Sequence, residues 1–180
     1  DETFTPSTTG INLENQLSNA ISYVTANVLP KIYFTTGHNE MDYTEISYVL
    51  EGENMTVEEV NLLTTPVPED ADILFIAGPR TDFTADEINK LDDYFDRGGA
   101  VYISIDPGVS VGRLTSYLNE WGITVGSDLV MEGDKSAYTF DSQAFILAQV
   151  QGHDITKSLS NQKISVIAPF ARSISIGNVS

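Results

Sequence analysis

The fold of this chain is decided by residues 72–107, which read DILFIAGPRTDFTADEINKLDDYFDRGGAVYISIDP. Two apolar runs of strand length, Ile73–Ala77 and Val101–Ile105, enclose a segment whose apolar residues recur at helical spacing. Within that segment Thr84 and Glu87 have the spacing of a capping box, and a double glycine supplies a left-handed stop. A strand, a helix and a strand in this order predict a βαβ unit with parallel strands and a right-handed crossover.

Outside this unit the same patterns predict further elements. Helices are expected at 12–28, 43–52 and 111–121, and strands at 31–36, 55–60, 123–130, 145–150, 164–168 and 173–176. The order predicts an α/β fold: a doubly wound, mostly parallel sheet with helices on both faces. We expect a linker at 1–11 and a single domain at 12–180. Two alternatives stay open: a small lobe around 123–150, and whether 173–176 pairs with the main sheet.

Composition excludes several classes of function. The net charge is −17, from 26 acidic and 9 basic residues, which argues against nucleic acid and against adsorption to an anionic membrane surface. The chain has no cysteine, so a disulfide framework, a thiolate zinc site and a cysteine nucleophile are excluded. The sequence contains no run of about 18 apolar residues, so it predicts no membrane-spanning segment. We interpret the chain as an excised fragment, so that anchoring segments would lie outside it.

Polar residues follow three of the predicted core strands. His38 and Glu40 follow the first strand, Arg80 follows the strand that begins the βαβ unit, and Asp106 follows the strand that ends it. Ligands of open α/β sheets bind outside the carboxyl ends of the strands. We therefore predict a ligand-binding site formed by these side chains, with Arg172, late in the chain, as a further basic group placed there by topology.

Each of these residues also has a structural interpretation. His38 and Glu40 could act as a base and its orienter, or could ligate a metal with Asp106, but one histidine and one carboxylate do not complete a metal site. We favour a ligand-facing or structural role and expect no metal and no cofactor. Arg80 could clamp an anion or could pair locally with Asp82 or Asp106. Asp106 could equally cap the strand end and the helix that follows.

The sequence contains no recognisable catalytic set. His153 and Asp154 are better explained as a turn with a helix cap than as a catalytic pair. No serine lies in a G-x-S-x-G elbow, and no phosphate-binding glycine motif follows a strand. The glycines at 108 and 112 lack the third glycine of a dinucleotide fingerprint, so we expect no nucleotide.

Several segments, taken in order, resemble a known family. They are KIYFTTGHNE, the stretch quoted above, LTSYLNEWGI, HDITKSL and APFARSI. Together they resemble the extracytoplasmic domain of GldG-like auxiliary proteins of ABC transport systems, over residues 12–176. The first turn of that family usually reads Gly-His-Gly-Glu, and Asn39 replaces its second glycine in this chain.

The resemblance implies a flavodoxin-like or class I glutamine-amidotransferase-like sheet in a membrane-anchored protein on the extracytoplasmic face of a bacterial cell membrane. Its implied partners are the ABC transporter membrane subunits or a related auxiliary protein, together with a possible small solute. Amidotransferase relatives use a cysteine, which this chain lacks. Related domains of intraflagellar-transport proteins point instead to assembly.

Three hypotheses of function follow. The first is a non-enzymatic auxiliary domain that binds a solute or a partner subunit. The second is a pure assembly domain without a small-molecule ligand, which an exposed apolar patch away from the strand ends would favour. The third is a hydrolase acting on a sugar or amide through His38 and the carboxylates, which requires His38 to lie within hydrogen-bond reach of a carboxylate or nucleophile in an open cleft.

Overall fold

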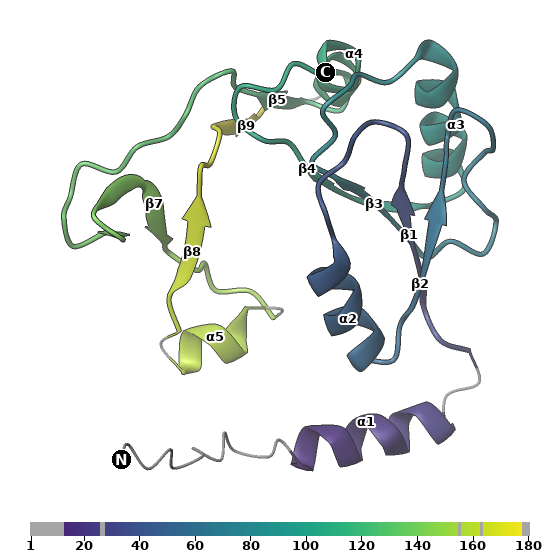
Figure 1. Cartoon of the computed structure of the whole chain (residues 1–180), viewed down its shortest axis with the longest axis horizontal. Coiled ribbons are helices and arrows are strands. Elements are labelled where there is room, and N and C mark those ends of the chain that lie inside the picture. Colours follow the sequence, from purple (N-terminus) through teal and green to yellow (C-terminus); the bar gives the residue numbers. More distant parts are fainter. Residues whose placement is uncertain (1–12, 26–27, 155, 163, 178–180) are drawn as a thin grey trace, which may run out of the picture.

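Figure 1 shows the computed structural model of the chain, which describes residues 13–25, 28–154, 156–162 and 164–177. Its centre is a four-stranded parallel sheet in the order β2-β1-β3-β4. The strands are β1 (Lys31–Thr35), β2 (Thr56–Val60), β3 (Ile73–Ala77) and β4 (Ala100–Ser104). This order is the flavodoxin-like one, which confirms the predicted α/β class.

The winding of the chain changes direction between β1 and β3. These neighbouring strands pair in parallel, from Ile32 opposite Ile73 to Phe34 opposite Phe75. From β1 the chain continues outward to β2, whereas from β3 it continues to β4 on the other side. The carboxyl ends of β1 and β3 therefore form the topological switch point, where open α/β sheets bind their ligands.

The predicted βαβ unit is confirmed as β3, α3 (Ala85–Asp96) and β4. Both bonds of the capping box are present: the Thr84 hydroxyl accepts from the backbone N–H of Glu87, and the Glu87 carboxylate accepts from the backbone N–H of Thr84. The helix ends where Gly98 adopts a φ of +83° and donates its N–H to the Phe95 carbonyl. Glycine adopts this left-handed conformation without steric cost.

Helices pack on both faces of the sheet, as predicted. On one face α3 and α4 (Gly112–Glu120) bury a core that includes Leu74, Ile76, Leu91 and Leu114. On the other face α2 (Thr44–Gly52) packs beside a smaller core around Phe34, whose ring stacks on that of Tyr43 with centroids 4.1 Å apart. Alternate residues of the central strands thus face two separate apolar layers.

The first helix, α1 (Leu13–Thr25), has an apolar face that does not join either core. Leu17, Ile21 and Val24 are exposed on it. The helix contacts the end of α2 and the turn after it through Asn19, whose side chain donates to the Gly52 carbonyl and whose backbone carbonyl accepts from the Asn54 side chain. No helix in the described part of the chain combines the length and apolar character that crossing a bilayer requires.

The last third of the chain forms two small antiparallel sheets. The elements are β5 (Ile123–Val125), β6 (Tyr138–Thr139), β7 (Ser142–Ala148), α5 (Lys157–Asn161), β8 (Val166–Pro169) and β9 (Ile174–Ile176). β5 pairs with β9, and β7 lies between β6 and β8. The late strand β9 therefore pairs with β5 rather than with the parallel sheet. The division into a linker and one domain stays a prediction, since the expected linker at 1–11 lies outside the described residues.

Candidate functional site

The turns after β1 and β3 are joined by backbone hydrogen bonds. The His38 carbonyl accepts from the backbone N–H groups of Arg80 and Thr81, at 2.8 and 3.0 Å, and Met41 donates to the Ala77 carbonyl at 3.1 Å. His38 and Arg80, predicted at one sheet edge, are thus brought together at the switch point. These bonds tie the two turns to each other, so they are not independent loops.

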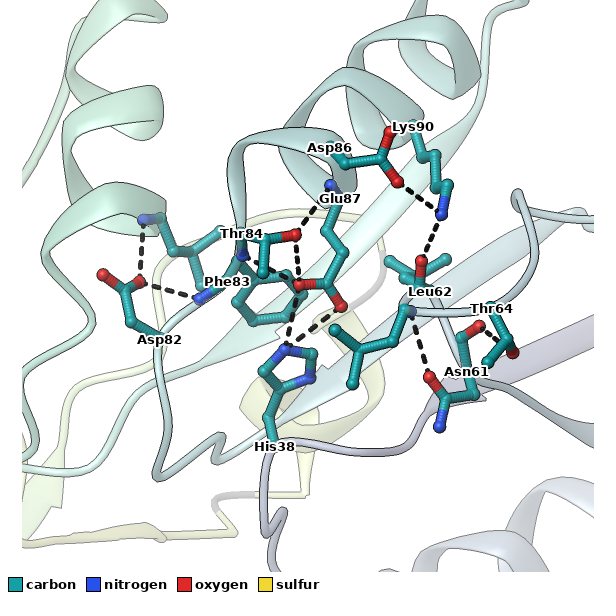
Figure 2. A network of polar contacts seen from close by, with 12 residues as sticks. His38, Asn61, Leu62, Thr64, Asp82, Phe83, Thr84, Asp86, Glu87 and Lys90 are labelled. Atoms are coloured by element: carbon teal, nitrogen blue, oxygen red, sulfur yellow. Dashed lines mark hydrogen bonds and ion pairs between the residues drawn. The ribbon is translucent and has the colours of Figure 1, made fainter.

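The side chain of His38 points into the protein. It is only 2% exposed, and its ring stacks on the buried ring of Phe83, with centroids 4.1 Å apart and planes 5° from parallel. Figure 2 shows the imidazole below this ring, with dashed lines from one ring nitrogen to the carboxylate of Glu87. His38 therefore does not line an open cleft.

Two carboxylates lie beside opposite edges of the His38 ring. Nε2 is 3.2 Å from Oε1 of Glu87, and Nδ1 is 3.5 Å from Oε1 of Glu40. The Glu87 side chain is fully buried at the start of α3, where its Oε2 accepts from the N–H and the hydroxyl of Thr84, both at 2.8 Å. Oε2 of Glu40 accepts from the His38 backbone N–H at 2.8 Å. We call His38, Glu40 and Glu87 the buried triad.

The buried triad combines hydrogen bonding and charge attraction, with Nε2 of His38 also 3.4 Å from Oε2 of Glu87. His38 Nδ1 and the Oε1 atoms of both glutamates are buried without a well-aligned hydrogen bond. Burial lowers the pKa of His38, but its contacts with Glu40 and Glu87 outweigh burial and raise that pKa above the usual 6.5. Burial likewise raises the pKa of Glu40, but the contact with the His38 ring and hydrogen bonds from backbone N–H groups outweigh it, and the pKa is lowered. Both shifts favour a protonated imidazole beside ionised Glu40.

The buried triad is poorly suited to metal binding. The carboxylates flank opposite edges of the imidazole, so they do not converge on one point. Within the described ranges, no group of three or more His, Asp or Glu side chains could hold a metal ion. The arrangement instead ties the end of β1 to the N-terminus of α3.

Arg80 is the exposed member of the switch point. Its backbone is fixed by His38, but within the described residues its side chain makes no hydrogen bond or ion pair. The described structure shows no local pair of Arg80 with Asp82 or Asp106, and the Asp82 carboxylate instead accepts from the N–H groups of Arg113 and Leu114 at the start of α4. Arg80 thus presents an unneutralised guanidinium at the edge where ligands are expected.

Asp106 and Arg172 form a separate group after β4. The Arg172 guanidinium donates to three carbonyl oxygens, those of Gly126 at 2.6 Å, Val109 at 3.1 Å and Asp106 at 3.2 Å. The contact with Asp106 therefore goes to its backbone and not to its carboxylate. No described contact links this group to the buried triad. That the five predicted residues bind a ligand stays a prediction.

Glu87 and Phe83 are the important residues that sequence reasoning missed. Glu87 was recognised as half of a capping box, but its second role as a partner of His38 has no local signal. His153 accepts from the N–H of Thr156 in the turn before α5, in agreement with its interpretation as a turn residue.

Comparisons with known proteins agree with this fold. The family described as "ABC-type uncharacterized transport system" matches residues 29–151. The human protein "Intraflagellar transport protein 52 homolog" is 31% identical over 86 residues, which are 46% of this chain and 20% of that protein. The chain therefore spans about a fifth of that relative's length. The solved structure of the "mmIFT52 N-terminal domain" has a TM-score of 0.65 and 21% identity, and the match covers 81% of this chain and 68% of that one.

Proposed function

Because the chain belongs to the auxiliary-component family of ABC-type transport systems, we propose that it is a non-enzymatic domain that binds a solute or a partner subunit. The proposed location is the extracytoplasmic face of the membrane, with anchoring through segments that flank the domain. The binding edge is formed by the carboxyl ends of the parallel strands.

The observation that carries this proposal is the unpaired guanidinium of Arg80 at the switch point. Arginine binds carboxylate and phosphate groups through two parallel hydrogen bonds, which gives both affinity and orientation. The turn that carries Arg80 is held by the carbonyl of His38, and His38 is held by two carboxylates. A fixed backbone lowers the entropy lost when a ligand binds. The proposed ligand therefore carries an anionic group.

The hydrolase alternative has little support. A general base must reach a proton on the substrate, whereas His38 is buried and both edges of its ring face carboxylates. The role we assign to His38 and Glu40 is to position the turn, while Arg80 touches the ligand.

One observation favours the assembly alternative. Leu17, Ile21 and Val24 of α1 are exposed, as are Tyr48 and Val49 of α2. Apolar side chains gathered on neighbouring helices are typical of protein–protein contact surfaces. On this alternative the partner covers the helices and the strand ends have no ligand.

Thermal unfolding against a panel of anionic solutes, namely dicarboxylates, acidic sugars, phosphorylated sugars and acidic dipeptides, tests the proposal. A ligand at 100 times its dissociation constant stabilises by about 2.7 kcal/mol, or about 5–10 °C in midpoint for a chain of this size. The shift should disappear in Arg80→Gln and persist in Lys135→Gln, which removes one exposed positive charge elsewhere. A shift that persists in Arg80→Gln would contradict the site. The assembly alternative would be favoured if no solute raised the unfolding midpoint and if the chain formed a complex with a partner subunit that Leu17→Glu abolishes.

A further inference from the structure

A second feature of the fold is an apolar pocket beside the last strand of the parallel sheet. Its volume is about 480 Å³, and it lies between β4, α4 and the β5–β9 pair. Alternate residues of β4 and the turn after it, Val101, Ile103 and Ile105, form one wall. Leu118 of α4 and the isoleucines and valine of β5 and β9 form the others. This set of residues contains neither Arg80 nor any member of the buried triad.

The pocket exists because β4 ends the sheet. β4 pairs with β3 on one side, whereas β5 and β9 pair with each other instead of continuing the parallel order. The spacing of Val101, Ile103 and Ile105 is that of strand residues facing one side. Their side chains lie on the sheet face that packs against the larger core, and they also border the pocket, because no further strand of the described chain pairs with the free edge of β4.

One charged side chain lines this pocket, and it is a cation. The pocket wall contains Arg172 and no acidic residue, in a chain of net charge −17. Three carbonyl oxygens hold the guanidinium through Nε and Nη1, and the structure gives Nη2 no partner among the residues it describes. Carbonyl oxygens orient the guanidinium but leave its positive charge unneutralised.

The carboxylate of Asp128, whose pKa the charge of Arg172 helps to lower, forms no ion pair with Arg172 in the described structure. Oδ1 of Asp128 accepts from the backbone N–H and the hydroxyl of Ser173, at 3.1 and 2.9 Å. The pKa of Asp128 is lowered chiefly by these Ser173 bonds, with the charge of Arg172 as a minor cause. The cation thus remains available for an anionic group from outside the chain.

We propose that this pocket binds an aliphatic ligand with a single anionic head, whose chain lies against β4, β5 and β9 and whose head pairs with Arg172. Pockets of 300–1,000 Å³ with apolar walls and a few oriented polar groups are typical of small-molecule sites. Charge complementarity selects the anionic head, because an uncharged ligand would leave the guanidinium unpaired. This inference goes beyond the function proposed above, since it uses different residues and can fail independently.

Calorimetric titration of the intact chain with decanoate tests the pocket. Decanoate should bind, decanol should bind at least about tenfold more weakly, and butyrate should not bind measurably. Raising the salt concentration should weaken the binding of decanoate and leave the binding of decanol unchanged. A lysophosphatidylglycerol, titrated below its micelle concentration, tests whether the ligand with an aliphatic chain and one anionic head is a lipid or a free acid. Tighter binding than that of decanoate would indicate a lipid. Failure of both amphiphiles, or equal affinity for decanoate and decanol, would overturn the proposal.

Two variants locate the head group. Arg172→Gln should weaken decanoate about tenfold or more, but it also alters three structural hydrogen bonds. Ile176→Glu therefore provides a second measurement: Ile176 lines the pocket and is 87% exposed, so a carboxylate there should leave the fold intact and repel the anion. Ile167→Glu on β8 is the matched control. An unchanged affinity of Ile176→Glu for decanoate would contradict the site. Tighter binding of an extended apolar peptide than of decanoate would also contradict it.

Discussion

Nε2 of His38 lies 3.2 Å from the carboxylate of Glu87, a residue 49 positions later in the chain. This contact joins the end of β1 to the first turn of α3, and the same histidine holds the turn that carries Arg80 through its carbonyl. Both partners are buried. The pair is thus the structural centre of the strand-end surface, and it explains why a histidine stands in a turn that has no open cleft.

Removal of His38 should destabilise the fold strongly. His38→Ala leaves the buried carboxylates of Glu40 and Glu87 without a cation, and loss of one partner of a buried pair costs about 3–5 kcal/mol. Urea unfolding measures the loss. In the double variant with Glu87→Gln, part of the loss should be recovered, because the carboxylate left unpaired is gone. Strictly additive effects of the two substitutions would contradict a direct interaction.

The buried triad also predicts how stability depends on pH. The folded pKa of His38 is raised, so its contribution is fully present below the unfolded value of about 6.5 and is lost as pH rises through the raised pKa. The folded pKa of Glu40 is lowered, so its contribution is present above about 4.5 and is lost as pH falls through the lowered pKa. The urea concentration at the unfolding midpoint, measured from pH 4 to pH 9, should therefore decrease as the pH rises above the raised pKa of His38.

The control for this pH dependence is the second histidine of the chain. His153 lies on an exposed turn, so His153→Gln should preserve the alkaline loss, whereas His38→Gln should remove it. An alkaline limb that survives in His38→Gln would assign the effect to another group.

Asn39 takes a backbone conformation that favours glycine or asparagine. Its φ is +53°, in the left-handed region, which asparagine adopts more readily than most residues other than glycine. Asn39→Ala should lower the free energy of unfolding by about 1–2 kcal/mol, since a Cβ-bearing residue without a local polar group is strained there. Asn39→Gly should be close to neutral in the same denaturation experiment. Equal losses in both variants would point to the Asn39 side chain rather than to its backbone.

The cap of α3 makes a separate contribution. Thr84→Ala removes the hydroxyl that accepts from the Glu87 N–H and donates to the Glu87 carboxylate, and should cost about 0.5–2 kcal/mol in unfolding free energy. Thr84→Ser retains the hydroxyl and should recover most of that loss. If serine were as destabilising as alanine, the methyl group rather than the cap would be responsible.

The βαβ unit was predictable because each of its parts has a local signal. The apolar runs of β3 and β4, the spacing of Thr84 and Glu87, and the double glycine all lie within one stretch of sequence. The rule that parallel strands end at one edge also brought His38 and Arg80 together correctly. These inferences required no knowledge of long-range contacts.

The remaining features depend on contacts between distant segments. The pairing of β5 with β9 joins two three-residue strands, which are too short to show a pattern that selects a partner. The contact of His38 with Glu87 requires β1 and β3 to be neighbours in a particular register. For α1, helical spacing predicted the apolar face correctly but could not show that Leu17 and Val24 are exposed.

The most direct test of the account is an NMR titration of the His38 imidazole in the intact chain. If His38 is a buried cation that positions the turn of Arg80, its pKa should lie above 6.5. That pKa should fall in the Glu87→Gln variant, provided that the variant remains folded. A His38 that titrates at its ordinary value and is unaffected by Glu87→Gln would contradict the buried triad. It would instead support an open imidazole, as the hydrolase alternative requires.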